Sequence, residues 1–215
     1  MLLISRIISG SSHPRPASGA GPGFDDFRAD NVYDQRQEGF TSVFLTLPLG
    51  DLTSTQARRI AGAARRFGNG SLRTTVDQNL VIPFVEAAGL PELYRGLKAI
   101  GLGEPGAGAL VDVTACPGTD TCKLGIASSR GLASELRTRL AERNLVLDEA
   151  VKRLRIKVSG CFNSCGQHHV ADLGFYGVSR NVAGRTVPHF QVVVGGEWSA
   201  NAGAFGLALG AVPSK

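Results

Sequence analysis

Two short segments carry all four cysteines of this 215-residue chain: ACPGTDTCKLG at residues 115–125 and SGCFNSCGQHH at residues 159–169. Each follows a stretch that is typical of a strand, LVDVTA before the first segment and LRIKVS before the second. The cysteines are spaced C-x5-C and C-x3-C, and they lie in turn sequence rather than on apolar faces. Thiolates that are this close within each pair suit a shared centre with four sulfur ligands.

Four interpretations of these cysteines are open at this point. Disulfides are disfavoured because the chain has no convincing secretory signal and is long enough to build a core without cross-links. Structural zinc usually has tighter cysteine pairs than C-x5-C, although the spacing does not exclude it. An iron–sulfur cluster is held by four thiolates and tolerates wider spacing. Inert buried cysteines fit poorly, since all four residues lie in turns.

The composition predicts a soluble globular protein. The chain is 43% hydrophobic, and no apolar run approaches the roughly 20 residues that cross a membrane. Without such a run or a clear signal peptide, free thiols predict a cytoplasmic location. The net charge of +5 is compatible with anionic ligands, but no basic run with interleaved aromatic residues suggests nucleic-acid binding.

The first half of the chain is predicted to alternate strands and helices after an irregular, disordered leader at residues 1–30. TSVFLTLPLG (41–50) predicts a strand by alternation, and Thr53 with Gln56 forms a capping box that begins a helix. A strand over SLRTTVDQNLVIPF (71–84) and a helix over LPELYRGLKAIGL (90–102) are expected to follow. This β-α-β-α order is half of a ferredoxin-like fold.

The second half is predicted to be a separate α/β domain that begins after the linker EPGAGA (104–109). A helix of several turns is expected directly after Cys122, which would place that thiol near a helix N-terminus. Cys161 and Cys165 are expected to share one side of a helical turn. The stretches at 171–180 and 186–196 predict a hairpin. His168 and His169 are interpreted either as residues that support the ligands from behind or as packing residues.

Three stretches resemble the sirohaem-containing nitrite and sulfite reductases. TACPGTDTCKLGI and VSGCFNSCGQHHVADLGFYG are similar to the cluster-binding signature, and residues 50–82 resemble the ferredoxin-like half-module that precedes it in that family. The likeness runs from about Asn31 to the C-terminus. It implies an α+β chain in which a ferredoxin-like half-domain (31–104) precedes a 4Fe–4S and sirohaem domain (105–215).

The resemblance implies roles for specific residues. Cys116, Cys122, Cys161 and Cys165 would hold one 4Fe–4S cluster, and Cys165 would also ligate the sirohaem iron. Further cofactor contacts are expected from the following residues: Arg73, Gln78, Asn79 and Asn163. An arginine fork suits a sirohaem carboxylate, and hydrogen bonds from the Asn163 segment to cluster sulfurs would tune the potential.

The implied activity is a six-electron reduction of nitrite to ammonia or of sulfite to sulfide, with a donor such as ferredoxin. CFNSCGQHH looks more like the nitrite-reducing members, although Phe162 stands where many members have proline. In the family a similar module occurs twice around one sirohaem, whereas this chain contains one copy, so a missing N-terminal half or a partner subunit is expected. The alternatives are an electron-transfer module that carries only the cluster and a zinc-stabilised interaction domain.

Overall fold

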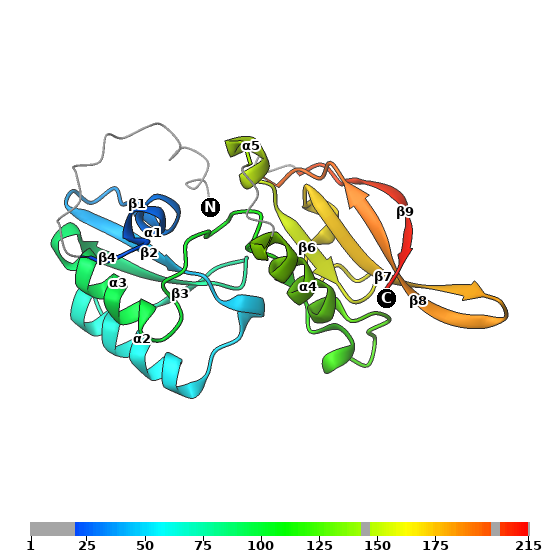
Figure 1. The fold of residues 1–215 in the computed structure, drawn as a ribbon, viewed down its shortest axis with the longest axis horizontal. Helices are drawn as coiled ribbons and strands as arrows, with labels where there is room; N and C mark the ends of the chain where they lie inside the picture. The colour runs from blue at the N-terminus through cyan, green and yellow to red at the C-terminus, as the bar shows by residue number, and fades with distance from the viewer. Residues whose placement is uncertain (1–19, 143–146, 199–202, 215) are drawn as a thin grey trace. The chain divides into compact units, whose positions relative to one another are not determined.

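The computed structural model describes residues 20–142, 147–198 and 203–214, which divide into two compact units between Asp112 and Val113. The predicted linker at 104–109 lies shortly before this division. Each unit combines helices with one sheet (Figure 1), so the predicted α+β class is confirmed. No helix among the described residues is both long and apolar enough to span a bilayer.

The N-terminal unit is a four-stranded antiparallel sheet, ordered β1-β2-β4-β3, with helices packed against it. Its elements are α1 Phe24–Asn31, β1 Val32–Asp34, β2 Phe40–Leu45, η1 Pro48–Gly50, α2 Ser54–Phe67, β3 Arg73–Thr74, β4 Leu80–Glu86, η2 Ala87–Gly89 and α3 Leu90–Lys98. The prediction of an irregular leader through residue 30 is wrong for α1, because Phe24 and Phe27 are buried in the core. Residues 1–19 of that leader lie outside the described residues.

The helix α2 begins as its sequence predicts. The Thr53 hydroxyl accepts the backbone N–H of Gln56 at 3.1 Å, and the Gln56 side chain accepts the Thr53 N–H at 3.0 Å, which completes the capping box. Ile60 and Ala64 are buried against the sheet. The apolar stripe therefore packs into the core while the arginines of α2 stay in solvent.

The predicted single strand over residues 71–84 is instead a hairpin of β3 and β4. Arg73 pairs with Val81 and Thr74 with Leu80. The turn between them is closed by Thr75, whose N–H donates to the Asn79 carbonyl at 2.9 Å and whose hydroxyl accepts the Asn79 N–H at 3.0 Å. The alternation of apolar and polar residues does not reveal this turn, because the turn is stabilised by hydrogen bonds between Thr75 and Asn79 rather than by burial of apolar side chains.

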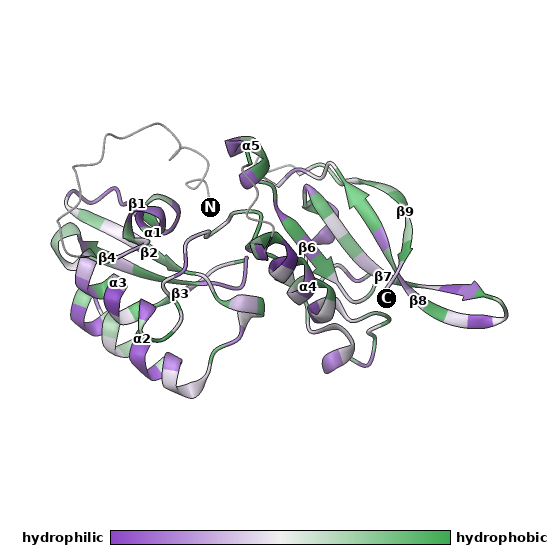
Figure 2. Cartoon of the chain, in the orientation of Figure 1, coloured by the Kyte–Doolittle hydropathy of each residue, from purple (hydrophilic) through white to green (hydrophobic). Residues whose placement is uncertain are grey.

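The C-terminal unit is a five-stranded mixed sheet, ordered β5-β6-β7-β8-β9, in which β5, β6 and β7 are parallel. Its elements are β5 Thr114–Ala115, η3 Gly118–Asp120, α4 Ser129–Glu142, α5 Glu149–Lys152, β6 Ile156–Ser159, η4 His168–Val170, β7 Leu173–Val182, β8 Arg185–Val194 and β9 Leu207–Pro213. The helix α4 contacts β5 and β6. Figure 2 shows apolar residues along the strands of this sheet.

Two local predictions in this unit are wrong. The helix α4 begins at Ser129 rather than directly after Cys122, because residues 123–128 form turns whose N–H groups at Ile126 and Ala127 donate to the Gly160 carbonyl. Cys161 and Cys165 do not share a helical turn, since Ser164 adopts a left-handed conformation with φ 57°. The predicted hairpin of β7 and β8 is confirmed, with Ala183 and Gly184 at its turn.

Candidate functional site

The two cysteine segments lie at the carboxyl ends of neighbouring parallel strands. The Ala115 position of β5 pairs with Val158 of β6, so Cys116 leaves its strand beside the point where the chain continues towards Cys161. Carboxyl ends of parallel strands meet at one edge of a sheet, and loops that follow them come together there. The backbone therefore brings together two segments that are far apart in the sequence.

Direct contacts join the two segments. The Gly160 N–H donates to the Cys116 sulfur at 3.1 Å, and the Gly160 carbonyl accepts N–H groups from Ile126 at 2.8 Å and Ala127 at 3.0 Å. A Cβ atom on Gly160 would lie 2.6 Å from the Gly118 Cα, which is closer than real side chains permit. The two cysteine loops can pack this closely only because the residue at their point of contact, Gly160, has no side chain.

The four thiols are free, and they divide into an inner and an outer pair. Cys116 and Cys161 are buried, whereas Cys122 and Cys165 are exposed. Within the described residues, no three Cys, His, Asp or Glu side chains are already gathered closely enough to hold a metal ion. The donor set and the packing of the loops fit a four-thiolate centre, although the thiols do not form a preorganised cage.

Side chains from the surrounding elements hold both loops. The Ser129 hydroxyl donates to the Cys116 carbonyl at 2.7 Å, and Arg130 forms an ion pair with Asp120 at 3.1 Å. On the other loop, the Ser159 hydroxyl accepts the Gly166 N–H at 3.1 Å and lies 2.8 Å from His168 Nδ1. The first turn of α4 and the end of β6 thus hold the backbone on which the cysteines lie.

His168 is packed behind the second cysteine loop. It is completely buried, and its ring stacks on Tyr176 with the ring centroids 4.5 Å apart. Its Nε2 atom has no hydrogen-bond partner among the described residues. Burial, with a smaller contribution from the charge of His169, lowers the pKa of His168 to about 4. The imidazole is therefore neutral at pH 7, as expected of a packing residue.

The residues predicted to face a second cofactor lie in the N-terminal unit, around the β3–β4 turn. Arg73 is exposed on the two-residue strand β3, and Gln78 adopts a positive φ of 64° within the turn. Asn79 is buried, and its amide is used inside the unit: Oδ1 accepts the Leu47 N–H at 2.8 Å and Nδ2 donates to Asp112 at 2.7 Å. These hydrogen bonds mean that Asn79 holds the surrounding backbone in position. The Arg73 side chain, by contrast, is exposed and can contact a ligand. Asn163 is exposed between the buried Cys161 and the exposed Cys165 of the second cysteine loop.

Two basic residues, Lys157 in β6 and Arg155 directly before it, were not recognised in the sequence. Lys157 is 1% exposed, with its Nζ 3.4 Å from the Thr114 hydroxyl and 5.4 Å from the centre of the Trp198 ring. The Arg155 guanidinium lies 5.0 Å from the centre of the same ring. Strand alternation in LRIKVS places both on one face, and that pattern is the signal by which they could have been found.

These features define a class of protein in which a ferredoxin-like half-domain is joined to an α/β domain that presents four thiols at one sheet edge. Models of two domain families match the chain. The nitrite/sulfite reductase ferredoxin-like half domain matches residues 33–100, and the nitrite and sulphite reductase 4Fe-4S domain matches residues 106–213. The chain belongs to the nitrite and sulfite reductase family.

The similar proteins include both kinds of reductase. The chain is 32% identical over 187 residues to the chloroplastic ferredoxin–nitrite reductase of Spinacia oleracea, which covers 86% of this chain and 31% of that protein. It is 34% identical over 186 residues to a ferredoxin sulfite reductase of Mycobacterium tuberculosis, covering 84% and 33%. The solved structure of the M. tuberculosis NirA protein aligns with a TM-score of 0.69 at 31% identity, covering 86% of this chain and 34% of that one. The chain thus spans about a third of these relatives.

Proposed function

We propose that this chain is the cluster- and sirohaem-binding half of a reductase that carries out the six-electron reduction of nitrite or sulfite. The observation that carries the proposal is the direct packing of the two cysteine loops through Gly160, in a domain that matches the family's 4Fe-4S model. Nitrite is slightly favoured by the sequence CFNSCGQHH. The reduced thiols suit a cytoplasmic location.

The four cysteines would hold the 4Fe–4S cluster, and Cys165 would bridge to the sirohaem iron. When bound, these groups would pass single electrons to the substrate. The chain's own part is to hold the thiolates, to donate hydrogen bonds to sulfur and to exclude water from the inner pair. The Gly160 N–H already donates to the Cys116 sulfur, and donors of this kind tune the potential of a cluster.

The sirohaem carboxylates would be bound by the exposed Arg73 with help from Gln78. Thr75 and Asn79 fix the β3–β4 turn that presents them. An arginine that is exposed on a short, well-anchored strand can form the paired hydrogen bonds that a carboxylate accepts. Direct contact of Asn79 or Asn163 with a cofactor stays a prediction.

Catalysis is proposed to need a second copy of the module, supplied elsewhere in a longer polypeptide or by a partner subunit, together with a donor such as ferredoxin. The support is the length of the relatives, of which the chain covers about a third. We expect the isolated chain to load a cluster but not to turn over nitrite or sulfite with reduced ferredoxin. Turnover by the isolated chain would contradict this part of the proposal.

The test is metal and sulfide analysis of anaerobically purified protein with its visible spectrum. The proposal expects about four irons and four acid-labile sulfides per chain, with haem-type bands above the broad cluster absorption. Zinc with neither iron nor sulfide would instead identify a zinc-stabilised domain. Cluster absorption without haem bands, even when sirohaem is supplied, would identify a module for electron transfer alone.

Cysteine variants separate the two cofactors. Cys116→Ser is expected to lose most of the iron and sulfide, because oxygen is a poor substitute for a cluster thiolate. Cys165→Ser should in addition abolish any haem spectrum. Ser134→Ala, on the exposed side of α4, is the control and should keep the full content of both. Wild-type iron content in Cys116→Ser would exclude the proposed ligand set.

A further inference from the structure

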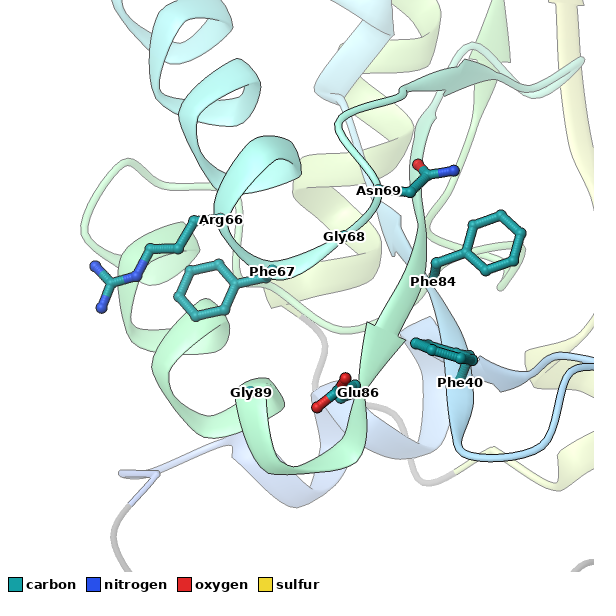
Figure 3. A pocket seen from close by; sticks show the side chains of 8 residues that line it. All are labelled: Phe40, Arg66, Phe67, Gly68, Asn69, Phe84, Glu86 and Gly89. Atoms are coloured by element: carbon teal, nitrogen blue, oxygen red, sulfur yellow. The ribbon is translucent and has the colours of Figure 1, made fainter.

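Several described residues other than glycine adopt a positive φ, a strained conformation that persists only where surrounding contacts hold it. They are Leu49, Gln78, Phe84, Ser164, Gln167 and Ala183. Phe84, for example, lies beside an open pocket of the N-terminal unit, where its ring meets that of Phe40 edge to face (Figure 3) and Gln35 accepts its N–H. The contacts around each strained residue therefore show which part of the backbone the fold fixes.

Two of these strained residues bracket the exposed thiol of the second cysteine loop. Ser164, with φ 57°, directly precedes Cys165, and Gln167, with φ 62°, directly follows Gly166. The Gln167 N–H donates to the Ser164 carbonyl at 2.8 Å, which closes a tight turn over these four residues. The Cys165 sulfur makes no hydrogen bond within the described part of the chain, so the backbone of this turn is what places it.

One residue of the turn is fixed to the sheet. The Gly166 N–H donates to the Ser159 hydroxyl at 3.1 Å, and a Cβ atom on Gly166 would lie only 2.2 Å from the Val158 carbonyl oxygen. Gly166 therefore lies directly against β6, the strand that leads into the same loop. Ser159 and Gly166 close the loop at its base, with Cys161 and Cys165 between them.

His168 holds the hydroxyl that fixes Gly166. Its Nδ1 lies 2.8 Å from the Ser159 oxygen, and its completely buried ring packs against Tyr176 and His169. Gly166 and His168 are the two hydrogen-bond partners of the Ser159 hydroxyl among the described residues. A hydroxyl with one proton cannot rotate away from a buried ring and keep both bonds, so the ring fixes its orientation.

We propose that His168 is a positioning residue for Cys165, and that it acts through Ser159 and Gly166 to hold the strained turn that presents this thiol. Without the bond to His168, the Ser159 hydroxyl can turn away from Gly166 and the strained turn can relax. A ligand whose backbone is already fixed loses less conformational freedom when it binds a metal. The inference rests on the proposed function, in which Cys165 is a cluster ligand.

Two substitutions separate this role from simple packing. His168→Asn keeps a polar atom near the position of Nδ1 and can retain the bond to Ser159, but it leaves part of the ring volume empty. His168→Leu fills more of that volume and removes the bond. A positioning role predicts that the asparagine variant behaves like the wild type and the leucine variant does not, whereas a packing role predicts the reverse order.

The first test is amide hydrogen exchange and NMR of the full, isotope-labelled chain without metal. The Gly166 amide should exchange about tenfold faster in His168→Leu than in the wild type, because one hydrogen bond is lost, and near the wild-type rate in His168→Asn. The Cys165 amide signal should shift in His168→Leu only. Ser159→Ala, which removes just the hydroxyl, should reproduce the leucine variant.

The matched control is His189→Leu, which removes another buried histidine of the same unit and should leave Gly166 exchange unchanged. In protein loaded with iron and sulfide, a chelator should remove iron about tenfold faster from His168→Leu and Ser159→Ala than from His168→Asn. Equal Gly166 exchange in the wild type and His168→Leu, or equal iron loss from the leucine and asparagine variants, would overturn the proposal. A wild-type chain that bound no iron would contradict the proposed function, whereas the exchange rates would still decide whether His168 holds the turn.

Discussion

His168 connects the packing of a single ring to the pH dependence of folding. The folded chain keeps the imidazole buried and lowers its pKa from 6.5 to about 4. Between these values the unfolded chain binds a proton that the folded chain does not bind. The contribution of the neutral, buried His168 to the free energy of unfolding is therefore fully present above pH 6.5 and is lost as the pH falls towards 4.

We expect the wild-type chain to lose up to about 3 kcal/mol of unfolding free energy between pH 7.5 and pH 4 through this group. Urea unfolding at intervals across that range measures the loss. His168→Gln removes the titrating ring and should show a shallower pH dependence. An identical pH slope in the two proteins would show that His168 does not titrate as its burial implies.

The cysteine loops show how one glycine allows two elements to meet. A methyl group at Gly160 would lie 2.6 Å from the Gly118 Cα and 3.0 Å from the Ala127 oxygen, and both are backbone atoms that cannot rotate away. Gly160→Ala is therefore expected to separate the loops at a cost of about 1–3 kcal/mol. The same change should lower the iron content of the purified protein.

The matched control for Gly160→Ala is Gly210→Ala in β9. Gly210 has nothing within 4 Å of its would-be Cβ and does not need a positive φ. It should therefore accept the methyl group with little change in unfolding free energy or iron content. Urea unfolding and iron analysis of both variants check the prediction, which fails if Gly160→Ala unfolds and binds iron like Gly210→Ala.

At the scale of the whole molecule, the chain has two compact units, and the core of the N-terminal unit is contained within it. Leu93 is 1% exposed in that core, and its truncation to alanine should destabilise this unit by about 3 kcal/mol. Trp198 is the only tryptophan of the chain and lies in the C-terminal unit. The fluorescence of Trp198 therefore reports the unfolding of the C-terminal unit.

We expect Leu93→Ala to shift part of the unfolding transition seen by far-ultraviolet circular dichroism while the Trp198 fluorescence transition keeps its midpoint. Val158→Ala, which opens a cavity in the C-terminal unit, should shift the fluorescence transition instead. If Leu93→Ala moved both transitions together, the two units would unfold as one cooperative block.

The sequence by itself determined the class of fold, the family and the elements with strong local signals. The capping box at Thr53 and the β7–β8 hairpin formed as predicted, because caps and tight turns depend on a few neighbouring residues. The cysteine spacing and the strands before each pair were enough to predict that the two loops belong together. The cysteine ligand set itself stays a prediction.

Only the tertiary structure decided where those local patterns end. The turn at Thr75 splits a predicted strand, α1 forms within a predicted leader, and the helix after Cys122 is delayed until Ser129. The Thr75 turn depends on local hydrogen bonds to Asn79, but in the other two cases distant partners outweigh local propensity. Tyr94 packs against Phe27, and Gly160 accepts the N–H groups that an earlier helix start would have used. Hydrophobic periodicity shows which residues prefer burial. The hydrogen-bond partner of a backbone N–H or C=O group, by contrast, can come from a segment that is remote in the sequence.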